Sequence, residues 1–389
     1  MTSEPGVADN VMARERADVG SYEDILAAAE RTTGMSDMGG TAHEEGLRIL
    51  VEDLSSPEAG LTGRGNYFQR SEVKSALVGR LLTQAQFNQR PEHVDVAIER
   101  PIFVMGLPRT GTTALHRLLH ADPQAQGLEM WITQYPQPRP PRDTWESDPI
   151  FNAMQQAFQA HHIASPEYLG IHYMDATSVE ECWRLLRQTG KSNSYESLAN
   201  VPRYTEWLAR QDWTDAYERH KRNLQLIGLN DQDKRWVLKN PSHMSALDAL
   251  MTVYPDALVV YTHRDPVTCI ASSCSLTAET TVGHSTTFVG DVIGQTQLDL
   301  WSRAYHAFHE ARPRYDESQF VDVAFSDLVK DPLGVTRGIY ERFDLDWTPA
   351  VQTAIEQIDR ESKEGAARPS HSYRLEDYGL TEDEVRARF

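Results

Sequence analysis

The fold is constrained most strongly by a short segment near residue 110. It consists of an apolar run, a loop bounded by glycines and a helical segment, in that order. Residues 101–105 read PIFVM, residues 106–113 read GLPRTGTT, and residues 114–120 read ALHRLLH. The apolar run indicates a buried strand, and the leucine spacing after the loop predicts a helix over about 112–120. A strand joined to a helix by a tight loop is the unit from which parallel α/β sheets are built.

Three later apolar runs supply the other strands that such a sheet needs. Helical patterns separate these runs from one another, near 243–253 and from about 266 onward. Because the strands alternate with helices, we predict an α/β fold in which a P-loop-like parallel sheet is flanked by helices on both faces. The three strand candidates and the two later helix candidates are RWVL (235–238), ALVVYT (257–262), FVDVAF (320–325), LDLWSRAYHAFHEAR (298–312) and DPLGVTRGIYERF (331–343).

The patterns divide the chain into three expected segments. Residues 1–95 are expected to form a helical N-terminal extension, because SYEDILAAAERT, TAHEEGLRILVEDLSS and SEVKSALVGRLLTQAQF have helical periodicity. The α/β domain is expected over residues 96–350. A C-terminal helix and loop segment is expected over residues 351–389.

A largely helical insertion is expected inside the α/β domain, over about residues 134–232. Its first part, QYPQPRPPRDTWESD (134–148), should be extended or irregular, because proline cannot continue a helix. Further on, Ser178 and Glu181 have the spacing of a capping box ahead of CWRLLRQ. We therefore predict a helix start at that position.

The glycine loop has the spacing of a phosphate-binding loop without its lysine. Gly106 and Gly111 stand as in G-x-x-x-x-G-K-[ST], but Thr112 occupies the lysine position and Arg109 lies inside the loop. A glycine turn entering a helix offers backbone N–H groups at the positive end of the helix dipole, which can hold a phosphate. The loop is therefore expected to bind phosphate without the lysine that reaches the β- and γ-phosphates of a nucleoside triphosphate. A tight structural turn is the alternative.

Two further polar clusters follow predicted strands. Arg264 comes after the strand that ends near residue 262, and Ser272 lies eight residues later, in the helix expected after Pro266. Lys239 and His243 follow the strand at 235–238. Ligands of open α/β sheets bind at the carboxyl ends of the strands, where these clusters should lie. The alternatives are a surface ion pair of Arg264 with Asp265 and a capping or packing role for His243.

Taken together, the three segments resemble the sulfotransferases that use 3′-phosphoadenosine 5′-phosphosulfate (PAPS), over roughly residues 100–345. GLPRTGTTAL is similar to that family's 5′-phosphosulfate loop, and Arg264 with Ser272 is similar to its 3′-phosphate pair. LKNPSH, YPDALVVYTHRDP and FSDLVKDPLGVTRGIYERFDL resemble the large bacterial branch, which has a helical N-terminal extension. The resemblance implies PAPS as co-substrate and adenosine 3′,5′-bisphosphate as product.

The resemblance also implies roles for individual residues. Arg109 would contact the 5′-phosphosulfate and stabilise charge on the bridging oxygen, and Arg264 with Ser272 would hold the 3′-phosphate. Arg368, in KEGAARPSHSYR (363–374), is a candidate for a second contact to the 3′-phosphate. The residues that would wrap the 5′-phosphate are Thr110, Gly111, Thr112, Thr113 and Ala114.

Two residues are candidates for the general base, and the sequence leaves both open. Glu129 lies twenty residues after Arg109, where tyrosylprotein and carbohydrate sulfotransferases tend to place a catalytic glutamate. His243, four residues after Lys239, resembles the catalytic histidine in the K-T-H segment of cytosolic sulfotransferases. Either side chain could accept the proton of a hydroxyl acceptor, given hydrogen-bond reach.

Charge and composition restrict the partners. The formal net charge is −19, which opposes binding to nucleic acid or to anionic lipid by bulk electrostatics. No apolar stretch approaches the roughly 20 residues that span a bilayer, and three cysteines without a C-x-x-C pair suit a reducing compartment. We therefore expect a cytoplasmic protein without stable membrane insertion, and the sequence leaves a homo-oligomer open.

The resemblance favours a hydroxyl acceptor on a hydrophobic small molecule or lipid. A sulfuryl group carries less negative charge during transfer than a γ-phosphoryl group does. Sulfuryl transfer therefore does not need the metal ion that kinases use to neutralise the phosphoryl charge. Two rival functions remain at this point. They are an ATP-dependent small-molecule kinase with a degenerate P-loop and a noncatalytic nucleotide-binding protein.

Overall fold

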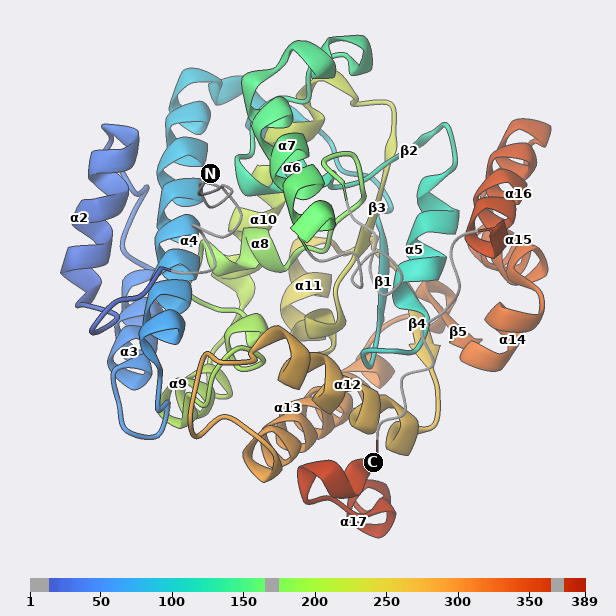
Figure 1. Ribbon diagram of the computed structural model, residues 1–389. Helices are drawn as coiled ribbons and strands as arrows, with labels where there is room; N and C mark the ends of the chain where they lie inside the picture. Colours follow the sequence, from blue (N-terminus) through green and yellow to red (C-terminus); the bar gives the residue numbers. More distant parts are fainter. Residues whose placement is uncertain (1–13, 165–174, 365–373) are drawn as a thin grey trace, which may run out of the picture.

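The computed structural model describes residues 14–164, 175–364 and 374–389. At its centre is a five-stranded sheet in the order β2-β3-β1-β4-β5, and every neighbouring pair of strands is parallel. This sheet, with helices on both faces, confirms the predicted fold class (Figure 1). The strands are β1 Ile102–Gly106, β2 Ala125–Gln126, β3 Arg235–Lys239, β4 Leu258–His263 and β5 Phe320–Ala324.

The register of the three inner strands aligns their carboxyl ends. Val104 of β1 lies opposite Lys239 of β3 on one side and opposite Val260 of β4 on the other. Gly106, the last residue of β1, lies opposite Thr262 of β4. The segments that follow β1, β3 and β4 therefore emerge at one edge of the sheet, as ligand sites in open α/β sheets require.

Strand β1 is buried on both faces, which explains why its sequence is a continuous apolar run. Ile102 and Val104 belong to a core that α5, α14, α15 and α16 cover, and Phe103 and Met105 belong to a larger core on the other face. Figure 1 shows α14, α15 and α16 on the far side of the sheet from the N-terminal helices. The four covering helices are α5 Thr112–His120, α14 Phe325–Lys330, α15 Pro332–Arg342 and α16 Pro349–Glu364.

The N-terminal segment is helical, as predicted, and packs into the larger core rather than standing apart from it. Tyr22 and Leu77 belong to the same buried cluster as Phe103 of β1. Glu72 of the longest N-terminal helix pairs with Arg187 of the inserted region. The helices of this segment are α2 Tyr22–Thr33, α3 Glu44–Leu54 and α4 Gly63–Gln89.

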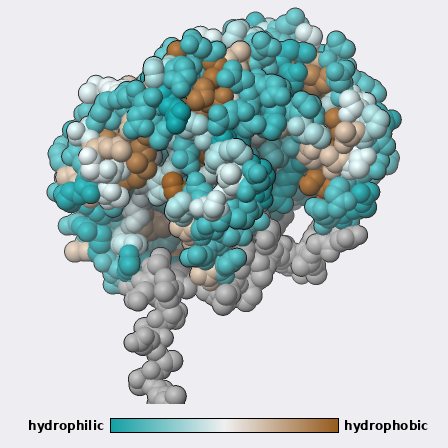
Figure 2. All heavy atoms as spheres, turned by 90° about the horizontal axis from the view of Figure 1, so that it is seen from above, coloured by the Kyte–Doolittle hydropathy of each residue, from teal (hydrophilic) through white to brown (hydrophobic). Residues whose placement is uncertain are grey.

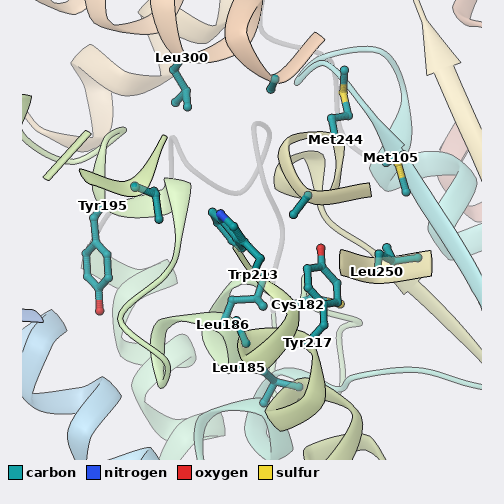
Figure 3. Close-up of a cluster of buried hydrophobic side chains, with 14 of the residues drawn as sticks. Met105, Cys182, Leu185, Leu186, Tyr195, Trp213, Tyr217, Met244, Leu250 and Leu300 are labelled. Atoms are coloured by element: carbon teal, nitrogen blue, oxygen red, sulfur yellow. The ribbon is translucent and has the colours of Figure 1, made fainter. Parts of the chain in front are cut away.

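The insertion between β2 and β3 is also largely helical, as predicted. Figure 3 shows how it joins the sheet: Leu185, Leu186 and Tyr217 from the insertion lie in one buried cluster with Met105 of β1 and with Met244, which follows β3. The inserted helices are α6 Met130–Gln134, α7 Pro149–Ala164, α8 Trp183–Arg187, α9 Pro202–Leu208 and α10 Thr214–Ile227.

The helices after β3 and β4, together with the C-terminal helix α17, cover the remaining part of the larger core. Figure 1 shows α12 and α13 below the sheet, with α17 beneath them. Pro266 begins α12, as predicted, and Asp265 caps it by accepting from the Thr268 backbone N–H. These helices are α11 Leu247–Val253, α12 Pro266–Thr280, α13 Asp291–Ala311 and α17 Glu382–Arg386.

Three elements differ from the prediction. Residues Arg142–Ser147, expected to be extended or irregular, form the 3₁₀ helix η2, which begins directly after Pro141. Strand β2 was not expected, because its two residues, Ala125–Gln126, are too few to show a pattern. The helix predicted near 243–253 is α-helical only from Leu247, and Pro241–Ala246 form the 3₁₀ helix η6 instead. The side chain of Asn240 accepts from the Ser242 N–H and fixes this tighter turn directly after β3.

Apolar residues are mostly inside the protein. The face shown in Figure 2 is largely hydrophilic, and its hydrophobic residues form small separate groups. Across the ranges that the structure describes, no helix combines the length and the apolar character that crossing a bilayer requires.

Candidate active site

The loop between β1 and α5 has the backbone conformation of a tight anion-binding turn. Its residues Gly106, Arg109 and Gly111 have φ values of 152°, 71° and 89°. Arginine pays a steric cost at such an angle, so surrounding contacts must fix this conformation. The fully buried hydroxyl of Thr110 lies 2.6 Å from the hydroxyl of Thr262, which ties the loop to β4.

Gly106 is required by the close approach of β4. A Cβ atom at residue 106 would lie 2.3 Å from the carbonyl oxygen of Thr262 and 2.4 Å from its hydroxyl oxygen. We expect Gly106→Ala to lower the free energy of unfolding by about 1–3 kcal/mol, through this clash and the left-handed φ. Urea unfolding measures the change, and Gly338→Ala is the matched control, because a Cβ there meets nothing within 4 Å. Equal stability of Gly106→Ala and the wild type would contradict this account of the loop.

Helix α5 begins directly at the loop, and no side chain caps its first turn. Gly111 is its N-cap and provides no side-chain hydrogen bond to the first N–H groups. Thr112 is buried and Thr113 partly exposed, while Ala114 is exposed. Such a helix start, with backbone N–H groups that no side chain caps and the positive end of the helix dipole, is an arrangement that can hold an anion.

Two arginines from distant parts of the sequence meet at the loop. Arg109 donates from Nε to the Ser272 hydroxyl at 3.1 Å, and Arg264 donates to the Arg109 carbonyl oxygen at 3.2 Å. The Arg264 guanidinium also lies over the ring of Phe325, 4.2 Å from its centroid. Among the residues with described positions, no carboxylate lies within salt-bridge distance of either arginine. Both guanidinium groups therefore keep N–H donors for an anionic ligand.

The surface ion pair that was the alternative for Arg264 is not formed. Asp265 instead pairs with Arg386 of α17 at 3.0 Å and caps α12 through Thr268. Arg264 is therefore available at the loop, where its backbone partner is Arg109.

Lys239 connects the end of β3 to the first turn of α5. Its Nζ donates to the Thr113 hydroxyl at 3.1 Å and forms an ion pair with the carboxylate of Glu181. The Lys239 side chain is almost fully buried, and that of Glu181 is 27% exposed. A buried cation and a partly exposed carboxylate thus stand beside the first turn of α5.

The capping box predicted from Ser178 and Glu181 is wrong. Helix α8 begins at Trp183, and its N-cap Cys182 makes no side-chain capping bond. The Ser178 hydroxyl hydrogen-bonds to Asp175, and the Glu181 carboxylate is drawn to Lys239. A capping glutamate and an ion-paired one look alike in the sequence, because the partner of Glu181 is 58 residues away.

Glu129, one of the two predicted bases, is in a buried ionic network. Arg139 donates to its carboxylate at 3.1 Å and to that of Asp231 at 3.0 Å. Its segment packs on the end of α5 farther from the loop, since a Cβ at Gly127 would lie 2.6 Å from the ring of His120. The structure does not bring the Glu129 carboxylate into contact with the loop residues or with Lys239.

His243, the other predicted base, is completely buried in the larger core. Its Nδ1 lies 2.6 Å from the Tyr217 hydroxyl, and its ring meets Phe103 edge to face at 5.1 Å between centroids. Burial lowers the pKa of His243 well below its usual range, so the imidazole is neutral. No hydrogen bond links it to the loop within the described ranges.

The structure therefore brings together five of the predicted site residues and adds one that was missed. Arg109, Arg264 and Ser272 form one contact group, Thr113 and Lys239 form another, and Glu181 joins the second. Arg368, the candidate for a second 3′-phosphate contact, lies outside the described residues.

Known proteins with a similar sequence or structure share this arrangement of the chain. The crystal structure of sulfotransferase STF1 from Mycobacterium tuberculosis H37Rv has a TM-score of 0.90 and 52% sequence identity, covering 96% of this chain and 99% of that one. The crystal structure of sulfotransferase STF9 from Mycobacterium avium has a TM-score of 0.86 and 28% identity, covering 96% of each chain.

A curated relative from Mycobacterium bovis is named omega-hydroxy-beta-dihydromenaquinone-9 sulfotransferase Stf3. It is 27% identical over 276 residues, and the match spans 64% of this chain and 64% of the relative. The profile of the sulfotransferase family matches residues 101–349, which include the loop, all five strands and both arginines. The chain belongs to the sulfotransferase family.

Proposed function

We propose that the protein transfers a sulfuryl group from PAPS to a hydroxyl of a hydrophobic small molecule or lipid. The observation that carries the proposal is the meeting of Arg109 and Arg264, two cations without a described carboxylate partner, at one glycine loop. A donor with phosphate groups at both its 5′ and 3′ positions needs two such anion sites. The family to which the chain belongs supports the same reaction.

Each part of the donor has a matching group in the protein. The first N–H groups of α5 would hold the 5′-phosphate, and Arg109 would lie against the bridging oxygen and the sulfuryl group. Arg264 and the Ser272 hydroxyl would hold the 3′-phosphate, with the guanidinium supplying charge-assisted hydrogen bonds. Lys239, which reaches Thr113, would add a second cation near the group in transfer.

The reaction follows from this placement of charge. The acceptor oxygen forms a bond to sulfur while the bond from sulfur to the bridging phosphate oxygen breaks, which releases adenosine 3′,5′-bisphosphate. Charge grows on the leaving oxygen, where fixed cations and N–H groups stabilise the transition state. The proton of the acceptor hydroxyl passes to a base. Glu129 and His243 stay predictions for this base.

A hydrophobic acceptor is supported by the name of the relative Stf3, which describes a hydroxylated menaquinone derivative as its acceptor. That relative is matched over 64% of its length, so the acceptor class is part of our proposal for this chain. An ATP-dependent kinase is the rival, and the threonine at position 112 disfavours it, because the P-loop lysine is missing there.

The test is transfer of radioactive sulfate from labelled PAPS to a panel of hydroxylated isoprenoids, sterols and phenols, with EDTA present. We expect a labelled product from at least one hydrophobic acceptor, at a rate that EDTA does not change. A purified, folded protein that labels no acceptor, but phosphorylates one from labelled ATP and magnesium, would overturn the proposal in favour of the kinase.

A further inference from the structure

The Glu181 carboxylate stands next to the point where the sulfuryl group would be transferred. It pairs with Lys239, and the same ammonium group donates to the hydroxyl of Thr113 in the first turn of α5. The carboxylate is therefore separated from this turn by one lysine side chain. A group in this position can reach an acceptor that approaches the donor from the insertion side.

The backbone on both sides of Glu181 is hydrogen-bonded to other segments, on one side to the loop after β2 and on the other to β3. The preceding residue, Glu180, donates its N–H to the carbonyl oxygen of Leu128 at 2.6 Å. The following residue, Cys182, donates its N–H to the carbonyl oxygen of Lys239 at 3.1 Å. Anchors on both neighbours hold the carboxylate in place, as an active-site group requires.

Glu181 is also more open than the two bases that the sequence suggested. Its side chain is 27% exposed, against 10% for Glu129, and His243 is fully buried. The carboxylate of Glu129 is occupied by Arg139, which holds it in the ionic network. Within the described chain, Lys239 is the one side chain that bonds to the Glu181 carboxylate, whose other lone pairs stay available for a hydroxyl proton.

The charges around Glu181 suit a proton acceptor. Burial raises its pKa above the usual value, the neighbouring carboxylate of Glu180 raises it further, and Lys239 opposes both effects. A carboxylate with a raised pKa is a stronger base, and the ion pair with Lys239 favours its charged form.

We infer that Glu181 is the general base of the transfer and accepts the proton of the acceptor hydroxyl. As that oxygen attacks sulfur, its O–H bond breaks and the proton moves to a Glu181 carboxylate oxygen. The bisphosphate leaves with the electron pair of the broken S–O bond, and Glu181 later returns the proton to water. This inference rests on the proposed function and names a residue for its proton-transfer step.

The test compares Glu181→Gln with Glu206→Gln, a control at an exposed glutamate far from the loop in sequence. Glutamine keeps the size of the side chain and a hydrogen bond to Lys239 but cannot accept the proton. With labelled PAPS and farnesol as the acceptor probe, we expect Glu181→Gln to lower kcat by about 10²- to 10⁴-fold. The affinity for adenosine 3′,5′-bisphosphate should stay within about threefold of the wild type, because the carboxylate does not bind the donor. Glu206→Gln, whose exposed carboxylate pairs with Arg210, should keep the wild-type activity.

The pH dependence separates a base from a structural residue. A base works only when it is deprotonated, so the kcat of the wild type should fall tenfold per pH unit below the pKa of Glu181. Farnesol does not ionise in the assay range, whereas the 3′-phosphate of the donor does, with a second pKa of about 6. Because the donor is the same for every variant, the part of the acidic fall in kcat that disappears in Glu181→Gln belongs to Glu181. Glu181→Gln should not show this part of the fall in kcat at low pH. Glu181→Asp, which keeps a carboxylate on a shorter side chain, should show it, with a lower kcat overall.

Several results would overturn the inference. Glu181→Gln with more than about a third of the wild-type kcat, or with the same fall in kcat at low pH as the wild type, would show that another residue takes the proton. A large loss in Glu129→Gln or His243→Asn, with Glu181→Gln active, would give the role to that residue. If Glu181→Gln and Glu181→Asp both lose bisphosphate binding, Glu181 is structural. A wild type that transfers sulfate to no acceptor instead contradicts the proposed function itself.

Discussion

Arg109→Ala is expected to lower kcat for sulfuryl transfer by about 10²- to 10³-fold, corresponding to about 2.7–4 kcal/mol of transition-state stabilisation. The guanidinium is exposed at the loop, and its one described side-chain partner is the Ser272 hydroxyl. Charge grows on the bridging oxygen as the S–O bond breaks, so loss of this cation acts mainly on the transition state. Stability should change little, because alanine meets the same φ of 71° that arginine already adopts.

Steady-state kinetics with labelled PAPS measures this effect, with two controls. Arg109→Lys keeps a cation and should recover part of the lost kcat. Arg142→Ala removes a surface arginine that pairs with Glu146, and its kcat should equal that of the wild type. If Arg109→Ala raises KM and leaves kcat unchanged, Arg109 binds the donor without stabilising the transition state.

Arg264→Ala is expected to lower the affinity for adenosine 3′,5′-bisphosphate by about 10- to 100-fold, because charge-assisted hydrogen bonds contribute about 1.5–3 kcal/mol each. The affinity for adenosine 5′-phosphate, which lacks the 3′-phosphate, should fall by less than about threefold. The difference between the two ligands isolates the 3′-phosphate contact. A general weakening of the loop would affect both ligands, because Arg264 also supports the Arg109 backbone.

Isothermal titration of both nucleotides measures this difference. Arg386→Ala is the matched control, because this nearby surface arginine pairs with Asp265, the residue that follows Arg264. It should bind both nucleotides as the wild type does. If Arg264→Ala lowers the affinity for both nucleotides equally, Arg264 does not bind the 3′-phosphate.

The central sheet could be predicted because its strands leave a strong local signal. Strands β1 and β4 are covered on both faces, so residues 102–105 and 258–261 are continuous apolar runs. The loop could be predicted for a similar reason, since Gly106 and Gly111 occur where φ is positive. Local sequence patterns report local conformation and burial.

The environment of the charged side chains could not be predicted, because it depends on partners far away in the sequence. Lys239 meets Glu181 across 58 residues, and Arg109 meets Ser272 across 163. The second of these contacts was not anticipated, because the family resemblance pairs Ser272 with Arg264 and not with Arg109. The first was missed, because a glutamate ahead of a helical segment has the local pattern of a cap.

The position of Glu129 illustrates the same limit. The family resemblance suggests a catalytic role for Glu129, twenty residues after Arg109, and this role stays a prediction. The sequence did not show that the Glu129 carboxylate pairs with the buried guanidinium of Arg139. The number of residues between two positions limits how far apart they can lie in the folded chain. It does not show which cation a carboxylate meets after folding.

The central claim is that the loop holds a 3′-phosphorylated nucleotide without a metal ion, and nucleotide binding to the wild-type protein tests it most directly. Isothermal titration should compare adenosine 3′,5′-bisphosphate with ATP, each with magnesium and with EDTA. We predict that the bisphosphate binds at least about tenfold more tightly than ATP, and equally well in magnesium and in EDTA. Binding of ATP alone, and only in the presence of magnesium, would contradict the account.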